Sequence, residues 1–82
     1  MGELLGEINL NQQIVYPNPS FGIFNFTIST SEFKFRVVNL MGELISEGNN
    51  LDKINLKSVP DGIYLLIIQN NRQRKVTRLV KK

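Results

Sequence analysis

The sequence predicts an all-β protein, folded as an antiparallel β-sandwich of about seven short strands. Turn-forming residues recur roughly every 8 to 12 residues and separate short apolar stretches. Several of these stretches alternate apolar with polar residues, as strands with one buried face do, and none has the helical period of about 3.6 residues. The longest apolar run, residues 63–68, is too short for a helix and fits a strand buried on both faces.

Composition limits the size of the domain and its chemistry. With 82 residues the chain forms one domain, which buries only about 60 to 65% of the surface that the unfolded chain exposes. It has no cysteine and no histidine, which excludes disulfides, thiolate chemistry and imidazole metal sites. No apolar run approaches the roughly 18 residues of a membrane helix, and the acidic opening differs from a positively charged export signal. We therefore expect neither a membrane span nor an N-terminal secretory signal within this sequence.

The folded domain is expected to cover residues 14–82. Residues 1–13 are polar without a sustained period, and they are interpreted as a linker or a lead-in added by cloning. The first strand, residues 14–16, is stopped by Pro17 and Pro19, which fix φ and remove two backbone donors. Gly22 permits a sharp return to the sheet. The second strand then turns three apolar side chains inward: Phe24, Phe26 and Ile28.

The middle of the sequence predicts a hairpin. Residues 39–42 have turn-forming residues at both ends, and a partner strand follows at residues 43–47. In the strand before the turn, alternation places Val38 on the outer face with the charged residues. The inward side chains of that strand are Phe33, Phe35 and Val37.

After a break at residues 48–50, residues 53–56 are expected to form a short strand or edge segment with Ile54 and Leu56 on one face. A type I turn is expected next, because its last three positions suit the residues found there. These residues are Pro60, Asp61 and Gly62.

The longest strand is expected to form a hairpin with the last strand, roughly residues 73–80. Asn70 and Asn71 close this hairpin, because Asn tolerates positive φ better than most residues. The register of the hairpin stays open, and so does which side of the longest strand faces outward: the set Tyr64, Leu66 and Ile68, or the odd-numbered set. If one set is exposed, we expect a dimer or a contact with a passenger protein on that face.

Catalysis has few residues to use. The carboxylates are dispersed, and Glu43 and Glu47 have the even spacing of an exposed strand face. Asp61 and Gly62 lack the alternating oxygen ligands of a calcium loop. We expect no enzyme, no metal and no cofactor.

Charge is concentrated at the end of the sequence. Residues 1–71 hold four basic and seven acidic residues, a net −3, whereas residues 72–82 hold six basic residues and no acidic one. Such a cluster can contact nucleic-acid phosphates, protect an edge strand against pairing with other chains, or be recognised by a partner. Nucleic acid is disfavoured, because the aromatic residues that would stack on bases are expected in the core: Phe24, Phe26, Phe33 and Phe35.

Four segments follow one another in a specific order: a Tyr-Pro-Asn-Pro stretch leading into a strand (residues 16–28), a strand, turn and strand block (37–45), a segment ending in Gly-x-Tyr (54–64) and a basic, apolar ending (75–81). The residues that carry this pattern are Tyr16, Pro17, Asn18, Pro19, Gly22, Gly42, Gly62, Tyr64, Lys75, Arg78, Val80 and Lys81. Together they resemble the type A C-terminal sorting domain of the type IX secretion system, although Asn39 stands where that family frequently has Asp.

The resemblance implies a signal rather than an activity, on an immunoglobulin-like β-sandwich of seven strands. In that family the domain follows a cargo protein and directs it through an outer-membrane translocon, and a sortase-like peptidase usually removes it at the cell surface. The motif residues would then be sorting determinants, and the protein would be exported through the periplasm to the surface or the medium. The alternative is an accessory module that binds a glycan or a protein through exposed aromatic residues. The candidates for that role are Tyr16, Phe21 and Tyr64.

Overall fold

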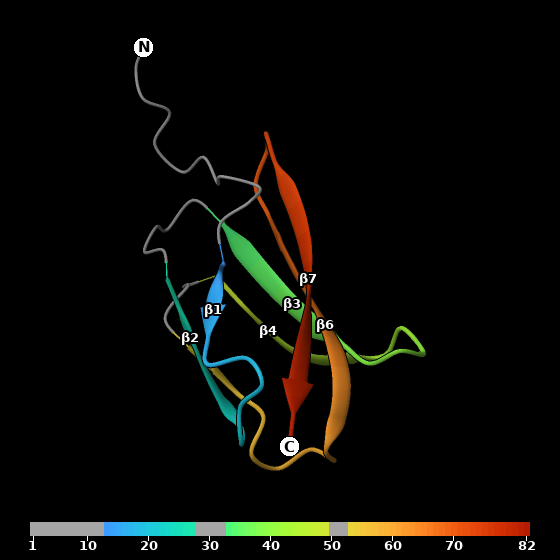
Figure 1. Cartoon of the computed structure of the whole chain (residues 1–82). Helices are drawn as coiled ribbons and strands as arrows, with labels where there is room; N and C mark the ends of the chain where they lie inside the picture. Colours follow the sequence, from blue (N-terminus) through green and yellow to red (C-terminus); the bar gives the residue numbers. More distant parts are fainter. Residues whose placement is uncertain (1–12, 28–32, 50–52) are drawn as a thin grey trace.

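The computed structural model describes residues 13–27, 33–49 and 53–82, and within them the regular secondary structure is entirely β. Two antiparallel sheets form the fold: one of three strands in the order β1-β2-β5, and one of four in the order β4-β3-β6-β7 (Figure 1). The strands are β1 (Val15–Tyr16), β2 (Ile23–Phe26), β3 (Lys34–Val38), β4 (Leu44–Gly48), β5 (Lys53–Asn55), β6 (Gly62–Gln69) and β7 (Arg74–Lys81). This arrangement confirms the predicted antiparallel β-sandwich. The proposed linker, except Gln13, lies outside the described residues.

The core lies between the two sheets and is built by the alternation seen in the sequence. Phe26 of β2 and Phe35 of β3 face each other across the layers, with ring centroids 5.5 Å apart. Ile28, expected beside them, lies outside the described residues. The buried apolar residues are Ile14, Val15, Phe24, Phe26, Phe33, Phe35, Val37, Ile54, Leu56, Tyr64, Leu66, Ile68 and Leu79. The side chains predicted to face inward on the second, third and fifth strands are therefore confirmed wherever they are described.

The longest strand, β6, is buried on one face only, so the prediction of burial on both faces is wrong. Tyr64, Leu66 and Ile68 point into the core, whereas Ile63 is 41% exposed. Leu65 and Ile67 are half-buried, because β3 and β7 pair with β6 on either side. In a two-layer fold the second sheet covers only the inner face of a strand. A run of six apolar residues therefore marks the middle of the sheet rather than a third layer.

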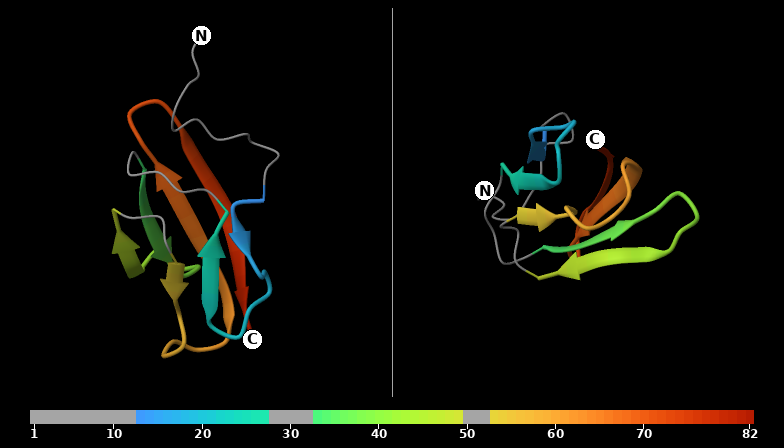
Figure 2. Two further views of the ribbon diagram at one scale, coloured as in Figure 1. Left: turned by 90° about the vertical axis from the view of Figure 1, so that its left-hand side faces the viewer. Right: turned by 90° about the horizontal axis from the view of Figure 1, so that it is seen from below.

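The β3–β4 hairpin projects beyond the three-stranded sheet, as Figures 1 and 2 both show. Its turn is closed by Asn39, whose Oδ1 accepts the N–H groups of Met41 and Glu43 at 2.9 Å each. Gly42 has a φ of +86°, which residues with a Cβ rarely adopt. The turn is thus closed by its own hydrogen bonds, although Met41 is 83% exposed.

The turn before β6 differs from the prediction, whereas the β6–β7 hairpin supplies the register that the prediction left open. The hydrogen-bonded turn before β6 closes between Leu56 and Val59, where the Val59 N–H donates to the Leu56 carbonyl over 3.3 Å. It therefore lies three residues before the type I turn expected at Pro60. In the β6–β7 hairpin the last paired residues are Gln69 and Arg74, which leaves residues 70–73 as the loop and fixes the open register.

Candidate functional site

The described residues contain no group of three or more carboxylate, histidine or cysteine side chains able to hold a metal ion. No described helix is long and apolar enough to span a membrane. The candidate site is the strand that gathers the positive charge, β7, together with the residues that hold it in place.

The segment from residue 16 to residue 22, here called the Pro-Asn-Pro loop, lies along the free edge of β7. Asn18 makes two hydrogen bonds there: its Nδ2 donates to the Arg78 carbonyl over 2.7 Å, and its Oδ1 accepts the Val80 N–H over 2.9 Å. A side-chain amide carries the same donor and acceptor pair as a backbone peptide. Asn18 thus substitutes for a neighbouring strand. The Tyr16-Pro17 and Asn18-Pro19 peptide bonds are both cis.

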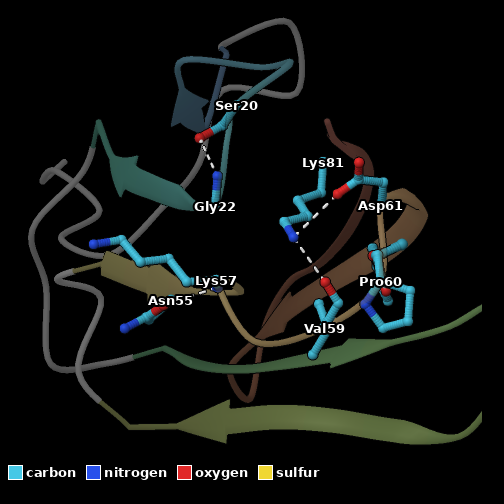
Figure 3. Close-up of polar contacts among 9 residues, drawn as sticks. Ser20, Gly22, Asn55, Lys57, Val59, Pro60, Asp61 and Lys81 are labelled. Atoms are coloured by element: carbon cyan, nitrogen blue, oxygen red, sulfur yellow. Dashed lines mark hydrogen bonds and ion pairs between the residues drawn. The ribbon is translucent and has the colours of Figure 1, made fainter.

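Ser20 continues the cover of the β7 edge. It forms a parallel bridge with Lys81, in which the Ser20 N–H donates to the Val80 carbonyl and the Lys82 N–H donates to the Ser20 carbonyl, each over 2.9 Å. The buried Ser20 hydroxyl accepts the Gly22 N–H over 3.1 Å (Figure 3) and donates to the Ile23 carbonyl. The edge from Arg78 onward is therefore protected by a loop, in addition to the Lys and Arg residues expected to protect it.

Gly22 brings the Pro-Asn-Pro loop against β5. Its φ is +151°, and a Cβ at this position would lie 2.8 Å from Lys57 Cγ and 3.1 Å from Lys57 Cα. The Leu56 N–H donates to the Gly22 carbonyl over 2.7 Å. Both the backbone conformation and the close approach therefore require glycine.

Lys81 faces the sandwich rather than the solvent. Its Nζ donates to the Val59 carbonyl over 2.7 Å and forms an ion pair with Asp61 Oδ1 at 3.1 Å (Figure 3). The Lys81 side chain is 9% exposed, whereas that of Asp61 is 71% exposed. Lys81 thus fastens the end of β7 to the segment that leads into β6.

Tyr64 is buried and also contacts this segment, because its hydroxyl donates to the Pro60 carbonyl. Tyr64 is therefore not an exposed aromatic residue. Of the three aromatic candidates for ligand binding, Tyr16 is 49% exposed and Phe21 is 79% exposed. The Lys82 Nζ lies 5.5 Å from the centre of the Phe21 ring, so Phe21 also contacts the end of the chain.

The register divides the motif residues of β7 between two faces. Leu79 pairs with Tyr64 and is completely buried, and Lys75 and Lys81 share its side of the strand. Arg78 and Val80 pair with Leu65 and Ile63, on the side turned away from the core. Of the motif residues in β7, only this second group faces away from the core.

The structure brings the first and last motifs of the sequence together and leaves one apart. Tyr16, Pro17, Asn18, Pro19 and Gly22 belong to the loop that covers the end of β7, whereas Gly42 lies at the turn of the β3–β4 hairpin. Sequence reasoning missed Ser20 and Val59, whose contacts with β7 are made by their backbone groups and leave no residue signature. The Asn between two prolines was the one available signal of the contact.

A family model described as the secretion system C-terminal sorting domain matches residues 14–82. The chain belongs to this family. No curated protein matches the chain. The sorting domain is a targeting module of type IX secretion and not a member of a catalytic family. Membership implies an attached N-terminal cargo, contact with the secretion machinery, and export across the outer membrane to the surface or the extracellular space.

Proposed function

We propose that the sorting domain delivers its cargo from the periplasm to the type IX translocon, which recognises β7, and that a sortase-like peptidase then removes the domain at the surface. It acts as a signal and carries out no catalysis, so it needs no metal or cofactor. The observation that supports this proposal most directly is the immobilisation of β7 by Asn18, Ser20 and Lys81.

A strand held in this way has its binding conformation before a partner arrives. Arg74 and Arg78 are exposed on its outward side, while Leu79 and Lys81 fix the strand from the inner side. A partner that binds β7 therefore spends little free energy on ordering it. The exposed cations supply attraction to an acidic surface and fix the register of binding.

The test is a reporter enzyme carrying a periplasmic signal peptide and fused to residues 14–82, expressed in a cell that has the type IX system. We expect the reporter outside the cell; a reporter retained in the periplasm would refute the proposed function. Deleting residues 75–82 should abolish export, but this deletion also removes Leu79 from the core. The sharper variant is therefore Arg74→Glu with Arg78→Glu, which changes exposed side chains only and should strongly reduce export.

A matched control separates the charge of β7 from the charge of the whole domain. Lys53→Glu with Arg72→Glu makes the same change in net charge at two exposed positions away from the outward side of β7. Export should be retained in this control. Equal loss in both double variants would mean that total charge, and not β7, decides recognition.

The second candidate function, an accessory module for a glycan or protein, rests on the exposure of Tyr16 and Phe21 beside the Pro-Asn-Pro loop. Aromatic faces of this kind stack on sugar rings and on partner side chains. Binding to a glycan array that disappears in the Tyr16→Ala and Phe21→Ala double variant would favour this function. No binding by the parent protein would remove it.

A further inference from the structure

The four-stranded sheet has a side turned away from the three-stranded sheet, here called the outer face (Figure 2). Strand pairing places its residues in rows that run across β3, β6 and β7: Lys34, Gln69 and Arg74 in one row, Arg36, Ile67 and Val76 in the next, and Val38, Leu65 and Arg78 in the third. Ile63 and Val80 pair beyond them. The apolar residues therefore form one continuous stripe, with cations around it.

The stripe is open to solvent although it lies on the middle of a sheet. Ile63 and Val76 are 41% and 45% exposed, and the remaining apolar members in these rows are half-buried. Leu44 of β4, which pairs with Val38, adds a residue that is 52% exposed. Single exposed aliphatic residues are ordinary, but a continuous row of them rimmed by polar groups marks an interaction surface. The question of which side of β6 faces outward is thus answered: it is the odd-numbered set, and the condition stated for a contact on that face is met.

One end of the outer face is hollowed. A groove of about 520 Å³ opens where β4, β3 and β6 meet, and its lining includes Lys34, Arg36, Glu47, Ile67 and Gln69. Two cations and one carboxylate line this groove beside apolar Ile67. The cations outnumber the carboxylate, so the groove favours an acidic side chain, to which Ile67 offers an apolar contact.

Charge decides between two occupants of the outer face. The face carries four cations, Lys34, Arg36, Arg74 and Arg78, and one acidic residue, Glu47. A second copy would bring two surfaces of net charge +3 together, and like charges across an interface are costly. A partner with an apolar centre and acidic surroundings complements both features of the face.

We propose that the outer face docks a protein surface with an apolar centre flanked by Asp or Glu side chains, one of which enters the groove beside Lys34 and Arg36. This inference rests on the proposed function and deepens it, because it adds β3 and β6 to the recognition surface. Of the two contacts expected on an exposed face of β6, a dimer or a passenger protein, it disfavours the dimer.

The test uses the exported reporter fusion with Lys34→Glu and Arg36→Glu, which leaves β7 unchanged. We expect exported reporter to fall about tenfold or more, equivalent to about 1.4 kcal/mol of binding. Lys53→Glu with Arg72→Glu is again the control, and it should export within about twofold of the parent. Thermal unfolding of both purified variants shows whether they are folded. Lys34→Gln with Arg36→Gln introduces no new negative charge beside Glu47, and it should reduce the exported reporter less than the glutamate variant does.

A direct binding measurement accompanies export. Purified parent protein is mixed with outer-membrane vesicles from the same cells at about 0.05 M and about 0.2 M salt, and the bound fraction should fall at the higher salt for the parent and the control. The Lys34 and Arg36 variant should bind weakly at both salt concentrations.

The outcomes separate this inference from the proposed function. A parent fusion that stays in the periplasm overturns the proposed function and the inference with it. An exported parent together with unimpaired Lys34 and Arg36 variants overturns the inference alone, as does equal loss in the control. Sedimentation of the parent as a dimer that the Lys34 and Arg36 substitutions dissociate would assign the face to a second copy and refute the acidic partner.

Discussion

Replacing Asn18 with alanine removes both hydrogen bonds that join the Pro-Asn-Pro loop to the edge of β7. The lost bonds have lengths of 2.7 Å to the Arg78 carbonyl and 2.9 Å from the Val80 N–H. A neutral hydrogen bond contributes about 0.5 to 1.5 kcal/mol net. Two such bonds together contribute about 1 to 3 kcal/mol. Because water can reach the exposed Arg78 carbonyl once Asn18 is removed, the loss falls in the lower part of this range. We expect a destabilisation of about 1 to 2 kcal/mol.

This loss is large for a domain of this size, because 1 kcal/mol shifts the midpoint of thermal unfolding by about 4 to 8 °C in domains of 60 to 100 residues. The expected shift is therefore about 5 to 15 °C. Asn18→Asp should unfold at a lower temperature than the parent. It keeps the acceptor for the Val80 N–H, but it places a carboxylate oxygen against the Arg78 carbonyl.

Urea unfolding gives the global free energy, and amide hydrogen exchange at Val80 reports the contact itself. Asn25→Ala is the matched control, because within the described residues the Asn25 side chain makes only a long hydrogen bond, 3.4 Å, to the Tyr16 carbonyl. It should change stability by less than about 0.5 kcal/mol. The reasoning is refuted if Asn18→Ala has parental stability and leaves exchange at Val80 unchanged.

Two further substitutions test other contacts of the site, both by urea unfolding. Lys81→Ala should cost about 2 to 3 kcal/mol, because it removes a buried stem and leaves the Val59 carbonyl and Asp61 without their cation, whereas exposed Lys82→Ala should cost less than about 1 kcal/mol. Similar values for the two lysines would contradict a structural role for Lys81. Gly22→Ala should lower the free energy of unfolding by about 3 kcal/mol or more, because the new Cβ would lie too close to Lys57 and φ is unfavourable for alanine. Gly42→Ala should lower it by only about 1 to 2 kcal/mol, because φ is +86° but no atom lies within 4 Å of the new Cβ. The reverse order would show that close packing at Lys57 is unimportant.

The sequence predicted the fold well where alternation decides the side of a residue. Phe24, Phe35 and Val37 are buried as expected, because a period of two leaves only one inward set. A continuous apolar run has no such period, which is why residues 63–68 did not reveal their outward side. The turn at Pro60 was placed by local preference, but the Val59 carbonyl that would have closed it accepts Lys81 instead.

The candidate site was less accessible to sequence reasoning than the fold. Sequence motifs identified Asn18 and Arg78, but the hydrogen bond between them spans 60 positions, and no local pattern predicts such a pair. The charge of the last strand was also visible. Which basic side chains of this strand face inward, as Lys81 does, and which face outward, as Arg78 does, depends on the register with β6. The sequence left this register open.

The contact of Asn18 with β7 has a consequence for biosynthesis. A nascent chain that stops before Arg78 has the Pro-Asn-Pro loop but nothing for Asn18 to hold, and its core lacks Leu79. The pairing becomes available only when translation has passed Val80. If the secretion machinery recognises β7, as proposed above, a product that terminates before Arg78 would lack both this contact and the recognised strand, and it would not be exported. The contact would then make export depend on complete synthesis of the sorting domain.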